Sequence, residues 1–279
     1  MSIDSLQTVT DTLQHTASKS TDTGWIFHHI LDGKEIELPF FHFSFPEFHL
    51  FGLDLTITKH VFFMLLASLL LIIALKLVAN SYKKTKVPKG LTNFIEILVL
   101  FVRDEIVKPT IGKGYEKFMP FLLTIFFFIL LSNFIGLVPY GATATSNISV
   151  TATLAIISFL VIQLGGIMKN GFFGYFKGLI PHGVPAWLLP IMFVVEILGL
   201  FTKPFALAIR LFANMTAGHI VILALIGLIF ILNTYIVVPV SIAFALFIYL
   251  LEILVALIQA YIFTMLSSLF IGMAVHQDH

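Results

Sequence analysis

Long apolar runs alternate with short polar segments along most of the chain, and this pattern predicts membrane-spanning helices. The first run lies within residues 60–82, and two uncharged runs follow at about 118–140 and 148–168. A helix of about 20 apolar residues crosses the hydrocarbon core of a bilayer, so each run is long enough for one crossing. The pattern therefore predicts three ordinary spans in the first two thirds of the chain.

The last third contains two apolar runs that are too long for one upright crossing. They cover about 184–232 and 236–275. As helices they would extend roughly 70 and 60 Å, against a hydrocarbon core of about 30 Å. Either each run contains two spans, or each forms one strongly tilted helix. Polar turn residues occur only at Lys203-Pro204 and from Asn233 to Pro239. We therefore favour two long tilted helices that form a hairpin, with Pro239 opening the second.

The remaining segments complete the predicted fold class. Residues 1–58 are polar and predict an extramembrane N-terminal segment, which leaves residues 59–279 as the membrane domain. Leu91 to Val107 mixes apolar and charged residues and predicts an amphipathic interfacial helix. We therefore expect an all-α polytopic membrane protein with about five membrane helices and one interfacial helix.

Lysine positions predict how the chain is oriented in the membrane. Lysine residues follow the first span closely and recur after the third, at Lys83, Lys84, Lys86, Lys89, Lys169 and Lys177. Because basic residues accumulate in cytoplasmic loops, both of these span ends are expected to face the cytoplasm. The N-terminus is then outside and the C-terminus cytoplasmic. The N-terminal tail lacks the composition of a signal or transit peptide, which favours the bacterial plasma (inner) membrane.

Composition narrows the class of protein further. Hydrophobic residues make up 58% and charged residues 11% of the 279 residues, which excludes an ordinary soluble domain. The absence of cysteine excludes disulfides, zinc–thiolate sites, iron–sulfur clusters and thiol nucleophiles. The N-terminal segment contains five histidines, which are His15, His28, His29, His42 and His49. Their spacing does not match a zinc-ligand pattern, so we predict no metal and no cofactor. The net charge of +1 gives no sign of a nucleic-acid partner, and we expect none.

Charged residues are scarce in the long hairpin. From Phe205 to Val275 the only formally charged side chains are Arg210 and Glu252, and His219 is the other group that titrates near neutral pH. An arginine at membrane depth costs at least about 2.5–3.5 kcal/mol, so it tends to face protein or a water-filled cavity. Since a guanidinium does not release its proton, Arg210 is predicted to be a fixed positive charge that attracts an anion.

Helical spacing relates the other candidate residues to Arg210. Asn214 lies about 40° from Arg210 around the helix, and small residues share that side, so a second helix can approach it. These small residues are Ala206, Ala213 and Ala217. In the predicted hairpin, His219 and Glu252 both lie about 20 Å from the turn, so we expect them to lie opposite each other on the two helices.

Two more polar residues lie deeper in the hairpin than this pair. Gln259 follows Glu252 by seven residues and shares its face, and it should lie roughly level with Arg210. Glu196 precedes Arg210 by fourteen residues and lies on the cytoplasmic side. From spacing alone, each candidate also has a structural interpretation. Arg210 could pair statically with Glu252, and His219 and Glu252 could form a satisfied hydrogen bond. Glu196 and Lys203 could be interfacial anchors, and Asn214 and Gln259 could join helices.

Several motifs in order resemble one family. They are PFALAIRLFANMTAGH from Pro204 to His219, LLSNFIGLVP from Leu130 to Pro139, TSNISVTATLA from Thr145 to Ala155, and IQAYIFTMLSSLFI from Ile258 to Ile271. The chain resembles subunit a of rotary F-type ATP synthases over roughly Phe118 to His276. The polar N-terminal segment matches little.

The resemblance implies roles for the candidate residues. Arg210 matches the arginine that faces a ring of subunit c, whose hairpins each carry a carboxylate in the membrane. Asn214, His219, Glu252 and Gln259 match positions of the proton path from the outer side, and Glu196 matches a position of the other half-channel. The family often has an acid at the position of His219 and a histidine at that of Glu252. Here the pair is exchanged, as in the mitochondrial branch.

The function implied by the resemblance is that of a non-catalytic stator subunit with two offset half-channels. Proton flow through them would drive a ring of subunit c, and the other expected partners are the peripheral-stalk subunit b and the lipid bilayer. The alternatives are an ion-coupled secondary transporter, which should show internal repeats and broken helices, and a purely structural membrane subunit. Whether protons or sodium ions are coupled is left open, because most of the ligands are on the ring.

Overall fold

The computed structural model describes residues 33, 35–38, 41–44, 49–50, 53–54, 56–84, 89–138, 141–178, 185, 187–232 and 234–276. Within these ranges five helices are long and apolar enough to cross a membrane. They are α3 (Lys59–Lys84), α6 (Met119–Leu137), α7 (Ile148–Asn170), α9 (Leu189–Leu232) and α10 (Val237–Val275). The predicted all-α fold with five membrane helices is therefore confirmed.

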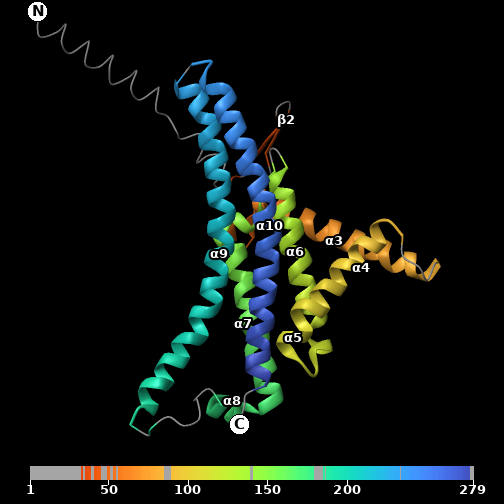
Figure 1. Ribbon diagram of the computed structural model, residues 1–279, viewed down its shortest axis with the longest axis vertical. Coiled ribbons are helices and arrows are strands. Elements are labelled where there is room, and N and C mark those ends of the chain that lie inside the picture. Colours follow the sequence, from red (N-terminus) through yellow and green to blue (C-terminus); the bar gives the residue numbers. More distant parts are fainter. Residues whose placement is uncertain are drawn as a thin grey trace, which may run out of the picture.

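The last two helices are single, continuous and packed against each other as a hairpin (Figure 1). Helix α9 has 44 residues and α10 has 39, which corresponds to about 66 and 58 Å of helix. Both lengths are near twice the thickness of a hydrocarbon core, so the helices must be strongly tilted. In Figure 1, α3 runs across the direction of this hairpin, as expected if α3 takes the shorter way through the bilayer.

Two prolines influence the hairpin helices. Pro239 lies in the first turn of α10, where the absence of an N–H costs little, and this matches the predicted helix start. Pro204 lies inside α9 and removes one helical hydrogen bond, which is a usual cause of bending. The first part of α9 slants away from the bundle in Figure 1. Asn233, the first residue of the predicted turn, lies outside the described residues.

The predicted interfacial helix is longer than the sequence indicated. Helix α4 (Leu91–Phe101) continues through a π-helical segment, Val102–Val107, into α5 (Lys108–Ile111). One side of this element is buried, including Val102 and Ile106. The element therefore packs on α10 as well as presenting exposed apolar residues on its other side.

A glycine brings α5 and α10 close together. A Cβ atom at Gly272 would overlap the carbonyl of Thr110, so only glycine fits at this crossing without movement. A hydrogen bond of 2.5 Å joins Thr110 Oγ1 to Ser268 Oγ, one turn away on α10. This contact anchors the end of α5 against the last third of α10.

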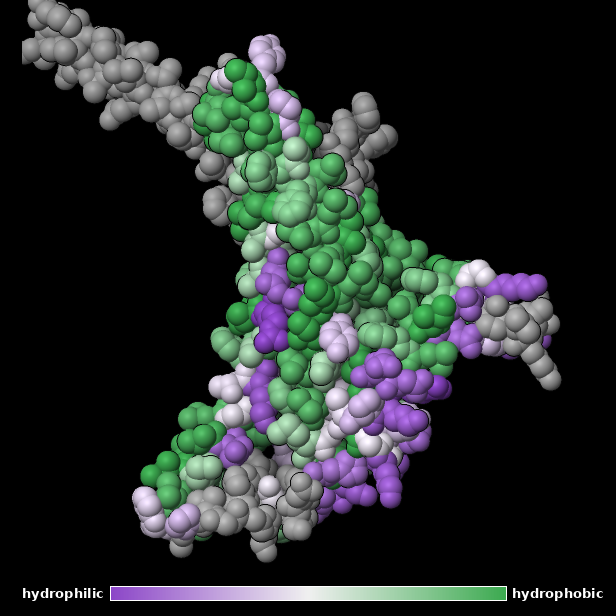
Figure 2. Space-filling view, viewed as in Figure 1, coloured by the Kyte–Doolittle hydropathy of each residue, from purple (hydrophilic) through white to green (hydrophobic). Residues whose placement is uncertain are grey.

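The surface of the helical region is mostly hydrophobic. Figure 2 shows apolar side chains over most of the visible face of the long helices, and hydrophilic ones gathered around the α4–α5 end. Many large apolar residues on α3, α9 and α10 are exposed. Such a surface is stable only against lipid or partner helices, so the chain is a multi-pass membrane protein.

Short connecting elements complete the described fold. They are η2 (Tyr115–Lys117), η3 (Ala144–Ser146) and α8 (Phe172–Gly178). Before α3, two small antiparallel pairs occur, β1 (Glu35–Leu38) with β2 (Phe41–Ser44) and β3 (His49–Leu50) with β4 (Leu53–Asp54). The polar pattern did not predict these strands.

Some predictions fall on undescribed residues. Most of the predicted N-terminal segment 1–58 lies outside the described ranges, including His15, His28 and His29, and so do Lys86 and Pro139. His42 and His49 lie in β2 and β3. The division at residue 58 therefore stays a prediction.

Candidate functional site

Two of the predicted site residues contact each other between the long helices. His219 on α9 and Glu252 on α10 are joined by a hydrogen bond of 2.5 Å between Nδ1 and Oε1. Glu252 is only 3% exposed. The glycine before His219 makes this possible, because a Cβ atom on Gly218 would lie 2.7 Å from Glu252 Oε1. The hairpin thus joins a half-buried histidine to a buried acid.

The hydrogen-bond partners of His219 favour one arrangement of hydrogens on its ring. Its Nε2 lies 3.2 Å from the carbonyl oxygen of Gly136 and 3.1 Å from Thr143 Oγ1. A carbonyl only accepts, so the contact with Gly136 favours a hydrogen on Nε2. The remaining proton then lies between Nδ1 and Glu252, giving either imidazolium with carboxylate or imidazole with carboxylic acid. The pair can therefore shift one proton between its members.

Further polar residues surround this pair at one end of the bundle. Thr145 Oγ1 donates to Asn133 Oδ1 at 2.5 Å, and both side chains are buried. Asn133 Nδ2 donates to the carbonyl of Ala256 on α10 at 3.4 Å. Thr216 Oγ1 reaches the carbonyl of Ser146 at 3.5 Å. We call these polar residues the η3 cluster, because η3 and the residues beside it supply many of them. Its members are Asn133, Thr143, Thr145, Ser146, Thr216, His219 and Glu252.

Arg210 differs from the other arginine of the chain. Arg103 donates from Nη2 to Asp104 Oδ2 at 2.8 Å, which raises the pKa of the guanidinium and lowers the pKa of the carboxyl. Arg210 is exposed and makes no hydrogen bond or ion pair with any residue in the described ranges. The static pair of Arg210 with Glu252 is therefore absent from the described part of the chain.

The surface beside Arg210 consists of small side chains. Ala206, Ala213, Asn214 and Ala217 are all exposed, as Arg210 is. These four and Arg210 form what we call the α9 strip. Small residues let a second helix approach closely, and a guanidinium at the centre of such a strip can meet an anion carried by that helix.

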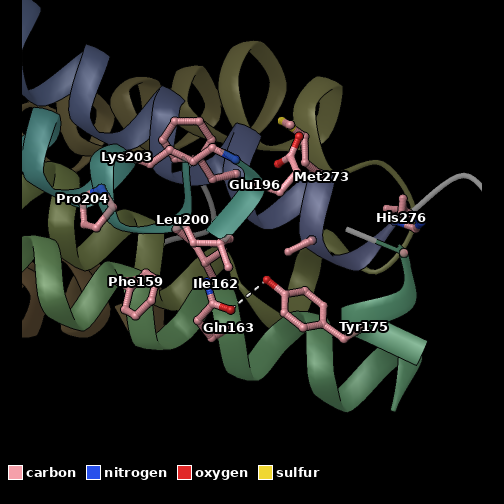
Figure 3. A pocket seen from close by; sticks show the side chains of 13 residues that line it. Phe159, Ile162, Gln163, Tyr175, Glu196, Leu200, Lys203, Pro204, Met273 and His276 are labelled. Carbon is pink, nitrogen blue, oxygen red and sulfur yellow. Dashed lines mark hydrogen bonds between the residues drawn. The ribbon is translucent and has the colours of Figure 1, made fainter. Parts of the chain in front are cut away.

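A cavity lies beside the part of α9 that precedes Arg210. Its volume is about 300 Å³, and Figure 3 shows side chains from α7, α8, α9 and α10 around it. Glu196, Lys203 and His276 line it. Lys203 Nζ lies 5.2 Å from the ring centroid of Phe270, a cation–π contact. Glu196 and Lys203, seven residues apart, are thus brought to one cavity without an ion pair between them.

Two polar residues of this cavity were not among the predicted site residues. Tyr175 on α8 is buried, and its hydroxyl donates to Gln163 Oε1 at 2.8 Å (Figure 3). Burial raises the pKa of Tyr175, so its hydroxyl stays a donor well into the alkaline range. The Nε2 atom of Gln163 is buried without a hydrogen-bond partner among the described residues. No sequence motif indicated this contact, because the two residues come from different helices.

Among the described residues, the two remaining predicted site residues make no hydrogen bond with the η3 cluster or with the residues that line the cavity. Asn214 lies on the exposed α9 strip, and Gln259 is buried on α10. Neither makes a hydrogen bond with a residue of the described ranges. In the same ranges, no group of three or more His, Asp or Glu side chains is arranged to hold a metal ion.

The two polar regions lie at opposite ends of α7. The η3 cluster adjoins its start at Ile148, and Gln163 of the cavity lies toward its end at Asn170. Along α9, Arg210 stands between them. Lys203 is about 10.5 Å before Arg210 and His219 about 13.5 Å after it. Arg210, which has no partner in the described part of the chain, therefore lies between a polar cluster and a polar cavity.

The fold and these residues define a multi-pass helical membrane protein with ionisable groups buried between its last two helices. Comparison with known families gives a specific assignment. Residues 61–272 match the family model described as ATP synthase A chain, and the chain belongs to this family.

Individual relatives agree with this assignment. A protein of Chloroherpeton thalassium named ATP synthase subunit a is 57% identical over 258 residues, covering 90% of this chain and 77% of the relative. One from Chlorobium phaeobacteroides BS1 with the same name is 53% identical, covering 91% and 77%. One from Myxococcus xanthus, also of that name, is 54% identical, covering 81% and 77%.

Proposed function

We propose that this chain is the stator proton-channel subunit of an F-type ATP synthase, and that Arg210 faces a ring of subunit c. The observation that carries the proposal is an exposed, unpaired arginine at the centre of the α9 strip, with separate polar regions on either side. A cation at membrane depth that has no partner among the described residues is costly, so an anion from another chain is the natural partner.

In this proposal the two polar regions are the two half-channels. The η3 cluster with Asn214 and Gln259 takes up protons from the outer side, and the shared proton of His219 and Glu252 is the relay next to the ring. The cavity lined by Glu196 and Lys203 leads protons to the cytoplasm. Its polar walls would hold the water molecules that carry protons from the ring to the cytoplasm.

Arg210 separates the half-channels and discharges the ring. Near a fixed cation, the carboxylate of a ring subunit is favoured in its charged form, and it releases its proton toward the cavity. When the ring turns that group into lipid, it must be neutral, because an unpaired carboxylate there is too costly. A proton carries about 2.3 kcal/mol per 100 mV, and this work is kept only if no proton passes Arg210 directly.

The orientation follows from the lysine positions. Lys169 at the end of α7 and Lys83 and Lys84 at the end of α3 face the cytoplasm, which puts the η3 cluster on the outer side of a bacterial plasma membrane. The N-terminus is then outside and the C-terminus cytoplasmic. The partners are the ring of subunit c on the α9 strip, the peripheral-stalk subunit b, and lipid. The unbroken helices α9 and α10 argue against a secondary transporter, whose sites use interrupted helices.

The test compares the two arginines of the chain. Inverted membrane vesicles carrying the whole complex with Arg210→Ala should make no ATP in response to an imposed proton gradient, because the ring carboxylate loses its fixed cation. Arg103→Ala is the matched control: it removes an arginine that is already paired with Asp104, and synthesis should stay near wild type.

The amount of assembled complex must be measured for both variants. Proton-driven synthesis at the wild-type rate by assembled Arg210→Ala complexes would refute the proposal. Equal loss in both variants would also count against it, since a general need for surface cations would then explain the result.

A further inference from the structure

The cavity beside α9 has a histidine at one end. His276, the residue that follows α10, lines the cavity and is exposed. Figure 3 shows Lys203 and Pro204 at one end of the lining and His276 at the other. His276 follows Phe270, whose ring contacts the Lys203 ammonium, by six residues, which is about 9 Å of helix. His276 therefore marks the end of the cavity that is farther from Arg210.

Contacts from three elements hold His276 in this place. Asn170 Nδ2 at the end of α7 donates to the carbonyl of Ala274 at 3.0 Å. Within α10, the backbone N–H of His276 donates to the carbonyl of Gly272 at 2.8 Å. The ring Nε2 lies 3.2 Å from the carbonyl of Lys113, in the loop before η2. The imidazole is thus positioned by the fold, although it is exposed.

The contact with Lys113 gives the two ring nitrogens of His276 different roles. A carbonyl only accepts, so Nε2 carries a hydrogen. This hydrogen bond is kept whether the ring is neutral or protonated, and the exchangeable proton binds at Nδ1. His276 can therefore take up and release a proton without losing its anchor.

The other ionisable side chains of the cavity are Glu196 and Lys203 of α9 and Tyr175 of α8. Burial raises the pKa of Tyr175, so its hydroxyl keeps its proton. The Lys203 ammonium is a cation over an aromatic ring. Imidazole is the side chain whose charge ordinarily changes near neutral pH, and His276 supplies it to this lining.

We propose that His276 is the proton-exchange residue at the cytoplasmic end of the cavity. When protons leave, Nδ1 takes one proton from water in the cavity, becoming imidazolium, and gives one to cytoplasmic water, returning to neutral imidazole. When ATP hydrolysis drives the complex backwards, the same steps run in reverse. The number of protons is conserved, and no other reactant is needed. This inference rests on the proposed function, because it names the group at which the proposed inner half-channel meets the cytoplasm.

A fixed proton-binding group matters most where free protons are scarce. At an encounter limit of about 10¹⁰ M⁻¹ s⁻¹, free protons at about pH 8 reach one site only about 100 times per second. Buffer molecules are far more concentrated than free protons, and an exposed imidazole can exchange protons with them. Proton uptake from an alkaline, weakly buffered medium is therefore the process in which the loss of His276 should be most visible.

A structural tie is the competing interpretation, in which His276 only attaches the end of α10 to the carbonyl of Lys113. Glutamine at this position keeps a side-chain N–H donor for that carbonyl but cannot bind a proton near neutral pH. A purely structural role therefore predicts a normal rate for His276→Gln, or a loss that no buffer repairs.

The experiment measures ATP-driven acidification of inverted vesicles that carry the whole complex, at alkaline pH and per assembled complex. With little buffer outside, we expect the initial rate of His276→Gln to fall at least about threefold. The loss stays below the hundredfold or so of a closed active site, because water also reaches this exposed position. A concentrated, membrane-impermeant sulfonate buffer added outside should restore the wild-type rate. The control is His42→Gln, which removes a histidine of β2 and should pump at the wild-type rate in both media.

A second variant keeps the inference testable if His276→Gln fails to assemble. His276→Asn carries an amide on a shorter side chain, and it should show the same loss and the same recovery with buffer. A wild-type rate in weak buffer, or an equal loss in weak and concentrated buffer, would overturn the inference. Failure of both variants to assemble would also overturn it, since His276 would then be needed to hold the structure rather than to exchange protons.

Arg210→Ala in the same vesicles separates the two proposals. If Arg210→Ala pumps no protons while His276→Gln is normal in weak buffer, only the role of His276 fails. If Arg210→Ala pumps at the wild-type rate, the proposed function fails and the role of His276 fails with it.

Discussion

The carboxyl of Glu252 needs space between two packed helices, and a glycine supplies it. Gly218 faces the carboxyl so closely that Oε1 would be 2.7 Å from an added Cβ atom. The second oxygen, Oε2, is buried without a hydrogen-bond partner in the described ranges. Small movements at this point therefore act directly on the bond between Glu252 and His219.

Gly218→Ala should disturb the His219–Glu252 pair without changing any ionisable group. The added methyl displaces the Glu252 carboxyl, and we expect proton-driven ATP synthesis per assembled complex to fall up to about a hundredfold, as a displacement of about 1 Å can cause for a positioned reacting group. Gly199→Ala is the matched control on the same helix, because its Cβ would meet only Glu196 Oε2, at 4.0 Å. Equal rates in the two variants would show that the position of the Glu252 carboxyl is unimportant.

At the residue scale, the sequence indicated the ionisable candidates better than their partners. Scarcity of charge pointed to Arg210, Glu252 and His219, because a titratable or charged group is conspicuous in an apolar run. His276 gave no such signal, since it follows the last apolar run, where histidine is ordinary. Its contact with the carbonyl of Lys113 depends on tertiary packing, which local spacing does not encode.

Helices are the scale at which the sequence was most informative. The spans were predictable because hydrocarbon requires every backbone polar group to be satisfied within the helix, and this leaves a long apolar run in the sequence. The joined element from Leu91 to Ile111 was not predicted at its full length. Its π-helical turn and its contact at Gly272 are set by packing on α10, which has no periodic signature.

The orientation of α7 can be tested at its two ends. Ser149 and Lys169 are both exposed, and the chain has no cysteine, so single cysteines can be introduced without background. We expect a membrane-impermeant thiol reagent to label Ser149→Cys from the outside of intact cells and Lys169→Cys only in inverted vesicles. The reverse labelling pattern would mean that the η3 cluster faces the cytoplasm, which would contradict the proposed orientation of the half-channels.

The whole molecule is shaped by the mismatch between its last two helices and the bilayer. Helices of about 66 and 58 Å cannot stand upright in a core of about 30 Å, so they lie at a slant and present one long side to their surroundings. Within the described ranges, the α9 strip on that side carries Arg210 without a partner. We therefore expect another chain to cover this surface. A ring of helices is a suitable partner, because a tilted hairpin can pack along its curved outer side.

The most direct test of this account is a density map of the whole complex in lipid, at a resolution that shows the side chain of Arg210. The account predicts helices of a ring of subunit c on Ala206, Ala213 and Ala217, with a carboxylate of that ring about 4–6 Å or less from the guanidinium, close enough to favour its charged form. Lipid on the α9 strip, or Arg210 paired with Glu196 or Glu252 of its own chain, would contradict it.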